Sequence, residues 1–367
     1  MNDYITVPYK LQFELSSMCN ALCLGCVRTD TNTYNEKKVT IPDKQYISFA
    51  TWEKILTAPE FNSVNCLEFC GTIDDPLMHP QLLEFLDFAA SLGKKYGIYL
   101  HTNAGLRNTV YWKKLAIALQ KHNDHMVKFS IDGLEDTNHI YRQNTVWSKI
   151  IENARAFIEQ GGNAGWQYLV FPWNEHQINQ AKELSLTLGF KEFLIRHDRS
   201  GATSTGLDVI RNVKNKNLLQ QHHADLDVQQ IPVYIDTRIK QIHKSLEHVV
   251  ENKIECNNQK YNMYFIGFDS KLWPCCFIHN GFLQLDPGKR LILEKRLFET
   301  YGSSDWNDLT KHSVKDILAH NFYKHDLVTS WKSKIHGLGN QDRIFRCTEV
   351  CNVKTLESLP IGNYKIL

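Results

Sequence analysis

The chain has 367 residues, enough for more than one ordinary domain. Hydrophobic residues make up 43% and charged residues 22% of it, as in globular proteins, and the net charge of +2 gives no reason to expect nucleic acid as a partner. No apolar run reaches the roughly 18–20 residues of a membrane helix, and no signal peptide is recognisable. Ten cysteines in such a chain favour metal binding over disulfides, so we expect a cytoplasmic protein with no membrane contact.

Short apolar runs alternate with longer segments of helical periodicity through the first 200 residues. This alternation predicts repeated βα units and a parallel sheet. The expected strands are 10–15, 64–69, 97–101, 126–131, 164–170 and 193–196. The expected helices between and after them are 48–58, 81–92, 109–121, 146–160 and 176–188.

The pattern loosens after residue 200, where a turn-rich stretch begins. Residues 201–255 are expected to form a linker with helical character. Residues 256–367 hold five of the ten cysteines and are expected to form a small α+β unit rich in cysteine. The sequence therefore predicts an α/β domain at 1–200, a connection at 201–255 and a second domain at 256–367.

Three cysteines follow the first expected strand with the spacing C-x3-C-x2-C: Cys19, Cys23 and Cys26. Cysteine thiolates hold iron–sulfur clusters, and a cubane takes four of them. Three thiolates on one loop bind three irons and leave the fourth open for chemistry. The alternatives are a zinc loop or three unrelated thiols, but zinc sites usually show paired C-x2-C or Cys/His spacing, and no histidine lies among these three.

The spacing and position of this loop resemble the cluster loop of the radical S-adenosylmethionine (radical SAM) superfamily. The resemblance implies a partial (β/α)6 barrel over residues 1–200 and a 4Fe–4S cluster on Cys19, Cys23 and Cys26 as the catalytic centre. By the same resemblance, the open iron binds S-adenosylmethionine (SAM), and the reduced cluster cleaves it to a 5′-deoxyadenosyl radical. A reductant such as flavodoxin or ferredoxin is then an expected partner.

Motifs at the following strand ends resemble the family's SAM-binding segments. The loop Cys70-Gly-Thr-Ile-Asp-Asp75 precedes a proline, and the resemblance assigns Gly71 and Asp75 to SAM binding. Asp74 stands where the family usually has glycine. Asn103, in a Thr-Asn-Ala-Gly run, either reaches SAM or braces the sheet.

The fourth expected strand ends in Ser130-Ile-Asp-Gly and is followed by Arg142. By resemblance, Ser130 and Arg142 bind the SAM carboxylate, which suits the fork of donors on an arginine. The alternative for Arg142 is a surface charge. Asp132 contacts the ribose or the substrate, or caps the turn.

The second set of cysteines surrounds an expected β-hairpin over residues 263–274, with its turn at Asp269-Ser270. It resembles the SPASM/Twitch extension of radical SAM enzymes, and the number of cysteines fits the shorter Twitch form with one auxiliary 4Fe–4S cluster. Ser270 replaces the family's usual glycine. A zinc site remains the alternative. Either Cys275 or Cys276 is the hairpin ligand; we assign as ligands Cys256, Cys275, Cys347 and Cys351.

The resemblance is specific for mechanism and poor for substrate. A ribosomally made peptide or protein is the leading expectation, because SPASM/Twitch enzymes often mature such peptides. Only residues 1–9 precede the first expected strand, so we expect a separate peptide-recognition protein as a partner. Radical oxidation of a small polyol or aminosugar is the alternative, and a non-enzymatic iron–sulfur electron carrier is the alternative from another class.

Overall fold

The computed structural model describes residues 4–5, 7–23, 26, 28, 44–197, 253–279, 301–303, 305–333, 344, 347, 351 and 364–366. All of the predicted connection at 201–255 except its last three residues lies outside the described residues. The domain boundaries at 200 and 255 therefore stay predictions.

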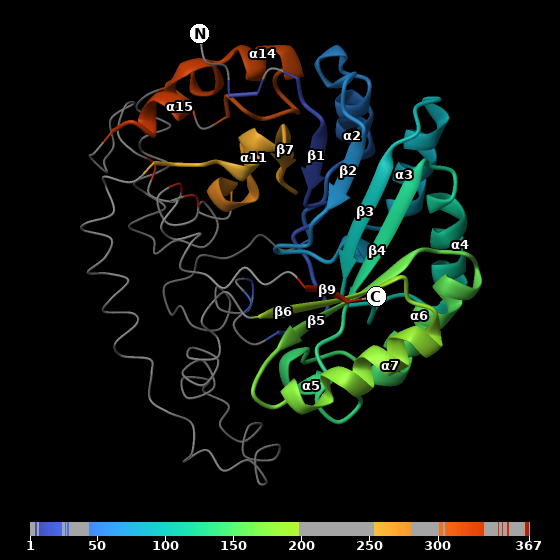
Figure 1. Ribbon diagram of the computed structural model, residues 1–367. Coiled ribbons are helices and arrows are strands. Elements are labelled where there is room, and N and C mark those ends of the chain that lie inside the picture. Colours follow the sequence, from blue (N-terminus) through green and yellow to red (C-terminus); the bar gives the residue numbers. More distant parts are fainter. Residues whose placement is uncertain are drawn as a thin grey trace.

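The described strands form one nine-stranded sheet in the order β8-β7-β1-β2-β3-β4-β5-β6-β9 (Figure 1). Strands β7 and β1 to β6 run parallel to one another, and the edge strands β8 and β9 pair antiparallel. The bounds are β1 (Lys10–Phe13), β2 (Cys66–Phe69), β3 (Gly97–Thr102), β4 (Asp124–Ser130), β5 (Ala164–Val170), β6 (Glu192–His197), β7 (Met263–Ile266), β8 (Leu272–Trp273) and β9 (Tyr364–Ile366).

This arrangement confirms the expected parallel α/β fold, and each predicted strand is found within a few residues of its predicted bounds. Among the described residues the sheet does not close, since β8 and β9 form its two edges. The sheet is therefore an open, partial barrel.

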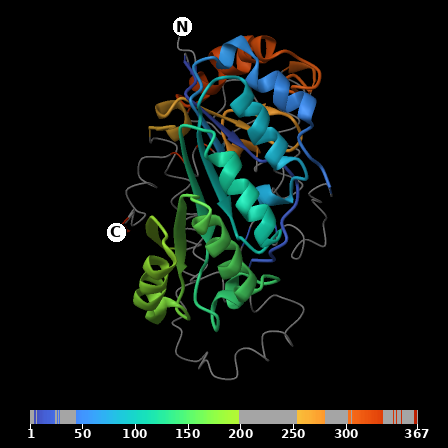
Figure 2. The ribbon, with the colours of Figure 1, turned by 90° about the vertical axis from the view of Figure 1, so that its right-hand side faces the viewer.

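The principal helices all cover one face of the sheet (Figures 1 and 2). Capping residues set their ends: the Ser48 side chain accepts from the Thr51 amide at the start of α2, and Gly189 ends α7 with a left-handed φ of 87°. None of the described helices combines the length and hydrophobicity that crossing a bilayer requires. The principal helices are α2 (Phe49–Leu56), α3 (Leu82–Ser91), α4 (Thr109–Leu119), α6 (Trp147–Glu159) and α7 (Ile178–Leu188).

Shorter helical segments lie in the connections and beyond residue 256. In the connections they are η1 (Pro59–Phe61), η2 (Pro76–Met78), α5 (Asn138–Tyr141) and η3 (Glu175–Gln177). Beyond residue 256 they are α11 (Asn257–Lys260), α14 (Val314–Ala319), the π-helical η6 (Phe322–Asp326) and α15 (Leu327–Ser330).

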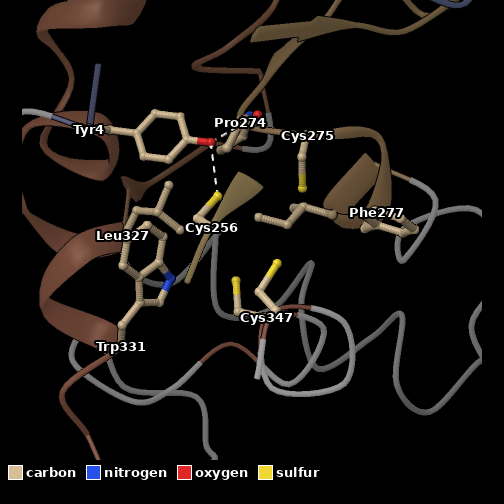
Figure 3. Close-up of a pocket in the computed structure, with 10 residues that line it drawn as sticks. Tyr4, Cys256, Pro274, Cys275, Phe277, Leu327, Trp331 and Cys347 are labelled. Atoms are coloured by element: carbon tan, nitrogen blue, oxygen red, sulfur yellow. Dashed lines mark hydrogen bonds between the residues drawn. The ribbon is translucent and has the colours of Figure 1, made fainter. Parts of the chain in front are cut away.

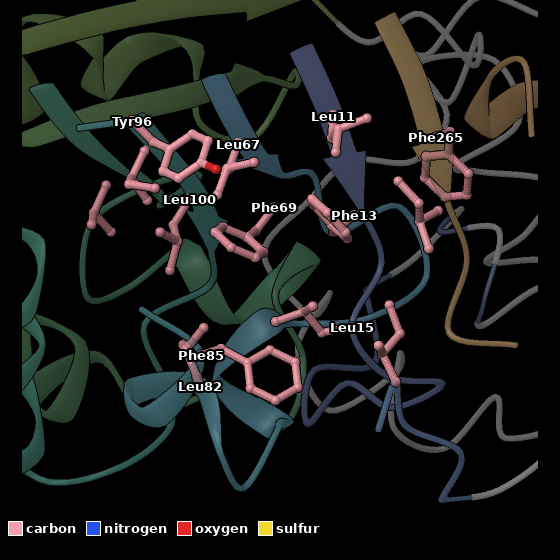
Figure 4. Packing of buried hydrophobic residues seen from close by; sticks show 14 of the residues in the cluster. Leu11, Phe13, Leu15, Leu67, Phe69, Leu82, Phe85, Tyr96, Leu100 and Phe265 are labelled. Carbon is pink, nitrogen blue, oxygen red and sulfur yellow. The ribbon is translucent and has the colours of Figure 1, made fainter. Parts of the chain in front are cut away.

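The core lies between the sheet and these helices. Successive strand residues point to opposite faces, so Leu11 and Phe13 of β1 face the helices, and Phe69 of β2 lies beside them (Figure 4). Trp52 of α2 stacks on Phe85 of α3 with ring centroids 4.9 Å apart. All five side chains are fully buried, and this apolar layer holds the sheet rigid beneath its loops.

The opposite face of the sheet carries polar side chains near its centre. Glu68 of β2 accepts hydrogen bonds from Lys10 at 3.0 Å and Gln12 at 3.2 Å, both on β1. His101 of β3 lies 3.4 Å from the same carboxylate. Because these side chains are only partly buried, this face is suited to a polar ligand.

The predicted hairpin is present, and it belongs to the same sheet as the barrel strands. Strand β7 pairs in parallel with β1 over all four of its residues, and β8 folds back on β7. In the turn, Ser270 has a left-handed φ of 60°, a conformation that glycine adopts without strain.

Candidate functional site

The parallel strands place their carboxyl ends at one edge of the sheet, where α/β proteins bind ligands. The cysteine loop follows β1, and Gly71 and Asp75 follow β2. Asn103 directly follows β3, and Ser130 is the last residue of β4. The topology thus brings the first predicted site to one edge.

The first cysteine set is held by side chains from the neighbouring loops. The Asn103 amide Nδ2 lies 3.7 Å from Cys19 Sγ, and Arg142 Nη1 lies 3.5 Å from Cys23 Sγ. The Cys26 amide donates to the Cys23 carbonyl at 3.2 Å. Burial raises the pKa of Cys19 well above its ordinary value and that of Cys23 to about 11, although Arg142 opposes the second shift. A bound cationic group would stabilise both as thiolates.

Asp75 fastens three loops together. Its backbone amide donates to the Met18 carbonyl in the cysteine loop at 2.9 Å. Its carboxylate accepts from the Leu77 amide at 3.1 Å, the Thr102 hydroxyl at 2.9 Å, and the Asn103 amide nitrogen and Nδ2 at 2.8 and 2.7 Å. Because both oxygens are used, Asp75 and Asn103 brace the strand ends in this structure.

Gly71 occupies a conformation that a side chain would strain. Its φ is 55°, and a Cβ there would lie 3.1 Å from the Asp74 carbonyl and 3.3 Å from the His101 carbonyl. Asp74, at the family's glycine position, is not among the positive-φ residues. The loop therefore needs its glycine at position 71 and accommodates aspartate at position 74.

Arg142 and Asp132 form a buried ion pair below β4. Arg142 Nε donates to Asp132 Oδ2 at 2.6 Å, and the two side chains are only 17% and 1% exposed. Asp132 Oδ1 also accepts from the Leu169 amide at 2.7 Å. Burial raises the pKa of Asp132, and the charge of Arg142 partly offsets that shift. Arg142 is therefore fixed beside Cys23.

The four cysteines assigned to the second set line one apolar cavity: Cys256, Cys275, Cys347 and Cys351. Figure 3 shows the cavity with the side chains of Leu327 and Trp331 at its wall. Cys276, the alternative to Cys275, does not line it. The four cysteines of this set all offer sulfur as the metal ligand, which suits iron–sulfur clusters and zinc alike.

Tyr4 reaches this cavity from the N-terminal segment, which the sequence did not indicate. Its hydroxyl donates to the Pro274 carbonyl at 3.1 Å and lies 3.5 Å from Cys256 Sγ (Figure 3). A hydrogen bond from Cys351, followed by that of Tyr4, lowers the pKa of Cys256 despite its burial. Cys256 is thus prepared to act as a thiolate ligand.

Cys276 lies on the side of the first site. The Thr72 hydroxyl contacts it and also lies 3.7 Å from Cys70 Sγ, at the end of β2. Burial, followed by the nearby Cys275, raises the pKa of Cys276. The two adjacent thiols therefore face different surroundings, although β8 ends at Trp273 and Cys276 begins a helical turn.

No group of three or more His, Cys, Asp or Glu side chains in the described part of the chain is arranged to hold a single metal ion. A four-iron cluster is larger than one ion, so the thiols around it need not approach one another as closely. Both cysteine sets have donors of the right chemistry for such a cluster. The first offers three thiols, and the second offers four.

A scan of protein-family models and a search of curated proteins found no match for this chain. The chain is similar in structure to SuiB from Streptococcus suis bound to its precursor peptide SuiA, with a TM-score of 0.52, 16% identity and coverage of 90% of this chain and 68% of SuiB. SuiB bound to S-adenosylmethionine gives a TM-score of 0.50, 16% identity and coverage of 90% and 67%. A structure of anSMEcpe with bound AdoMet has a TM-score of 0.49 and 14% identity, and the match covers 86% of this chain and 78% of anSMEcpe.

The likeness to SuiB shows that this chain shares the fold of SuiB. At this identity the chemistry must be inferred from the chain's own residues.

The buried Asp132–Arg142 pair gives a test of the site's architecture. Replacing Asp132 with Ala leaves a buried guanidinium without its partner, so we expect the free energy of unfolding to fall by about 3–5 kcal/mol. The control is Asp87→Ala, which breaks an exposed pair with Lys121 and should cost less than about 1 kcal/mol. Denaturant unfolding of both variants measures the difference; equal losses would contradict the assignment of a buried pair.

Proposed function

We propose that this chain, which has the radical SAM fold, is an enzyme that cleaves SAM reductively and abstracts hydrogen from a peptide or protein substrate. The observation that carries the proposal is the convergence at one edge of the sheet of three cysteines with the Asp75 brace and Arg142. An electron carrier would need the thiols but would have no need for Gly71, Ser130 and Arg142 at the same edge.

We assign the 4Fe–4S cluster to Cys19, Cys23 and Cys26 and SAM to the side that these cysteines leave open. When bound, this pair supplies the 5′-deoxyadenosyl radical that removes hydrogen from an unactivated carbon. The chain's own residues position and shield the pair. Arg142, fixed by Asp132, offers its Nη2 to the SAM carboxylate, and Ser130 at the end of β4 is the second donor.

The second cysteine set would hold the auxiliary cluster. Its cavity is walled by Leu327 and Trp331, which exclude water, and the Tyr4 hydroxyl lies 3.5 Å from Cys256 Sγ. Hydrogen bonds to sulfur and exclusion of solvent set the reduction potential of such clusters. A reductant such as flavodoxin or ferredoxin would supply the electron for the first site.

A peptide substrate is supported by the likeness to SuiB, which was solved with its precursor peptide. The polar face around Glu68, with Lys10 and His101, lies on the side of the sheet away from the helices and suits a polar chain such as a peptide. A separate recognition protein remains part of the proposal.

The deciding experiment is incubation of the reconstituted protein with SAM and dithionite under anaerobic conditions. We expect 5′-deoxyadenosine to form, and mass spectrometry of candidate precursor peptides to show a change of mass. Replacing all three of Cys19, Cys23 and Cys26 with Ala should abolish both. If the protein modifies a polyol or an aminosugar but no peptide, the peptide proposal is wrong and the small-molecule alternative replaces it. If the protein does not cleave SAM at all, the electron-carrier alternative remains.

Iron content tests the two cysteine sets separately. We expect about eight irons per chain after reconstitution, two cubanes' worth, and about four in the triple variant at Cys19, Cys23 and Cys26. Full iron in the triple variant, or zinc in the purified protein, would contradict the assignment.

The same measurement separates the two adjacent thiols of the hairpin. Cys275→Ser should lose the auxiliary cluster, because Cys275 lines the cavity of the second set. Cys276→Ser is the matched control and should keep the full iron content. The reverse pattern would make Cys276 the ligand, whereas a lost rate with intact clusters in Cys276→Ser would assign it to catalysis.

Arg142→Ala tests the SAM carboxylate site. Loss of one charge-assisted hydrogen bond should cost roughly 1.5–3 kcal/mol, which is about tenfold to a hundredfold in SAM affinity. Equilibrium dialysis with SAM measures the loss, and iron content should stay constant. Unchanged affinity would reduce Arg142 to a partner of Asp132 and Cys23.

A further inference from the structure

Three buried polar side chains lie where the loop 70–75 meets the hairpin, and the ligand assignments above use none of them. Glu14 follows β1, Asp74 lies in the loop, and His279 follows the hairpin; they are 0%, 5% and 0% exposed. In the described part of the chain, Glu14 Oε2, Asp74 Oδ1 and both ring nitrogens of His279 have no hydrogen-bond partner. Unsatisfied buried groups are costly, so such a concentration calls for a functional explanation.

Glu14 holds the backbone of the loop that carries Gly71 and Asp75. Its Oε1 accepts hydrogen bonds from the amides of Ile73 and Asp74, the second at 3.2 Å. In return, the Asp74 carboxylate accepts from the Ser16 amide at 2.9 Å, just beyond Glu14. Burial, and then the charge of Glu14, raise the pKa of Asp74. The two carboxyl groups therefore fasten the loop to the start of the cysteine segment.

His279 lies against the other oxygen of Glu14. Its Nδ1 is 3.8 Å from Glu14 Oε2, and its Nε2 is 3.5 Å from Asp269 Oδ1 in the hairpin turn. The imidazole ring therefore lies between the carboxyl groups of Glu14 and Asp269. The His279 amide also donates to the Cys275 carbonyl at 3.3 Å, one helical turn earlier.

The hairpin is shaped around this imidazole. A Cβ at Gly267 would lie 2.5 Å from both His279 Nε2 and Asp269 Oδ1, so only glycine leaves room for the contact. The ring also packs on Phe265 of β7, with centroids 5.2 Å apart. The position of His279 is therefore fixed by the backbone of the hairpin.

We propose that His279 and Glu14 are positioning residues for SAM binding: the hairpin, through His279, holds Glu14 in place, and Glu14 holds the loop 70–75 in its binding conformation. This inference rests on the proposed function, because it assigns SAM to that loop. It adds that the segment bearing Cys275 is coupled to the SAM site through three side chains, Asp269, His279 and Glu14.

The test is a double-mutant cycle on the reconstituted full chain, with SAM affinity measured by equilibrium dialysis alongside iron content. Glu14→Gln keeps an oxygen for the loop amides and replaces the carboxyl oxygen that faces His279 with an NH2 group, and His279→Gln removes the imidazole. Each single variant should bind SAM about three- to thirtyfold more weakly with unchanged iron. Because the two residues act through each other, the double variant should lose little more than either single variant.

The matched control is His122→Gln. His122 is also buried, but it precedes β4, at the amino ends of the strands and away from the cysteine loop. The His122→Gln variant should bind SAM with the same affinity as the unmodified protein. If His279→Gln does not fold, Glu14→Gln by itself carries the measurement.

The inference is overturned if the unmodified protein binds SAM and both single variants bind it within about twofold, or if the losses multiply in the double variant. A fall in melting temperature without loss of SAM affinity would assign both residues a purely structural role. Failure of the unmodified protein to bind SAM would instead overturn the proposed function, and with it this inference.

Discussion

Buried carboxylates that accept hydrogen bonds from several loops at once hold the site together. A parallel sheet brings its loops to one edge, but loops of different origin have no regular hydrogen-bond partners there. Asp75 joins the loops after β1, β2 and β3, and Asp132 joins β4, β5 and Arg142. Burial raises the pKa of both, and the N–H and guanidinium donors around them stabilise the charged forms that make this bracing possible.

The two cysteine sets are held in contrasting surroundings, which suits different tasks. The first set lies among polar loops, with Arg142 beside Cys23 and Asn103 beside Cys19. The second lines an apolar cavity with a single tyrosine hydroxyl close to Cys256. A site that binds and activates a small molecule needs directed polar groups, whereas a site that only holds a redox centre benefits from exclusion of water.

The pairing of β7 with β1 links the two sets mechanically. Because the hairpin extends the barrel sheet, its turn lies at the same edge as the cysteine loop, and Asp269 and His279 reach Glu14 there. A hairpin on an independent domain would have no fixed relation to the loop 70–75. The C-terminal segment therefore contributes to the order of the first site as well as to its own cavity.

The sequence by itself determined the βα order, the three-cysteine loop and the strand-end motifs, because apolar periodicity and cysteine spacing are local properties of the chain. It also indicated the hairpin and its turn, where Ser270 has a left-handed φ of 60°. Only the tertiary structure decided that Cys275, and not Cys276, faces the cavity. The two cysteines are adjacent in the sequence, so the spacing to the other cysteines fits either of them. The tertiary structure likewise brought Tyr4 to Cys256 and His279 to Glu14, contacts between residues more than 250 positions apart that depend on the β7–β1 pairing and leave no local signal.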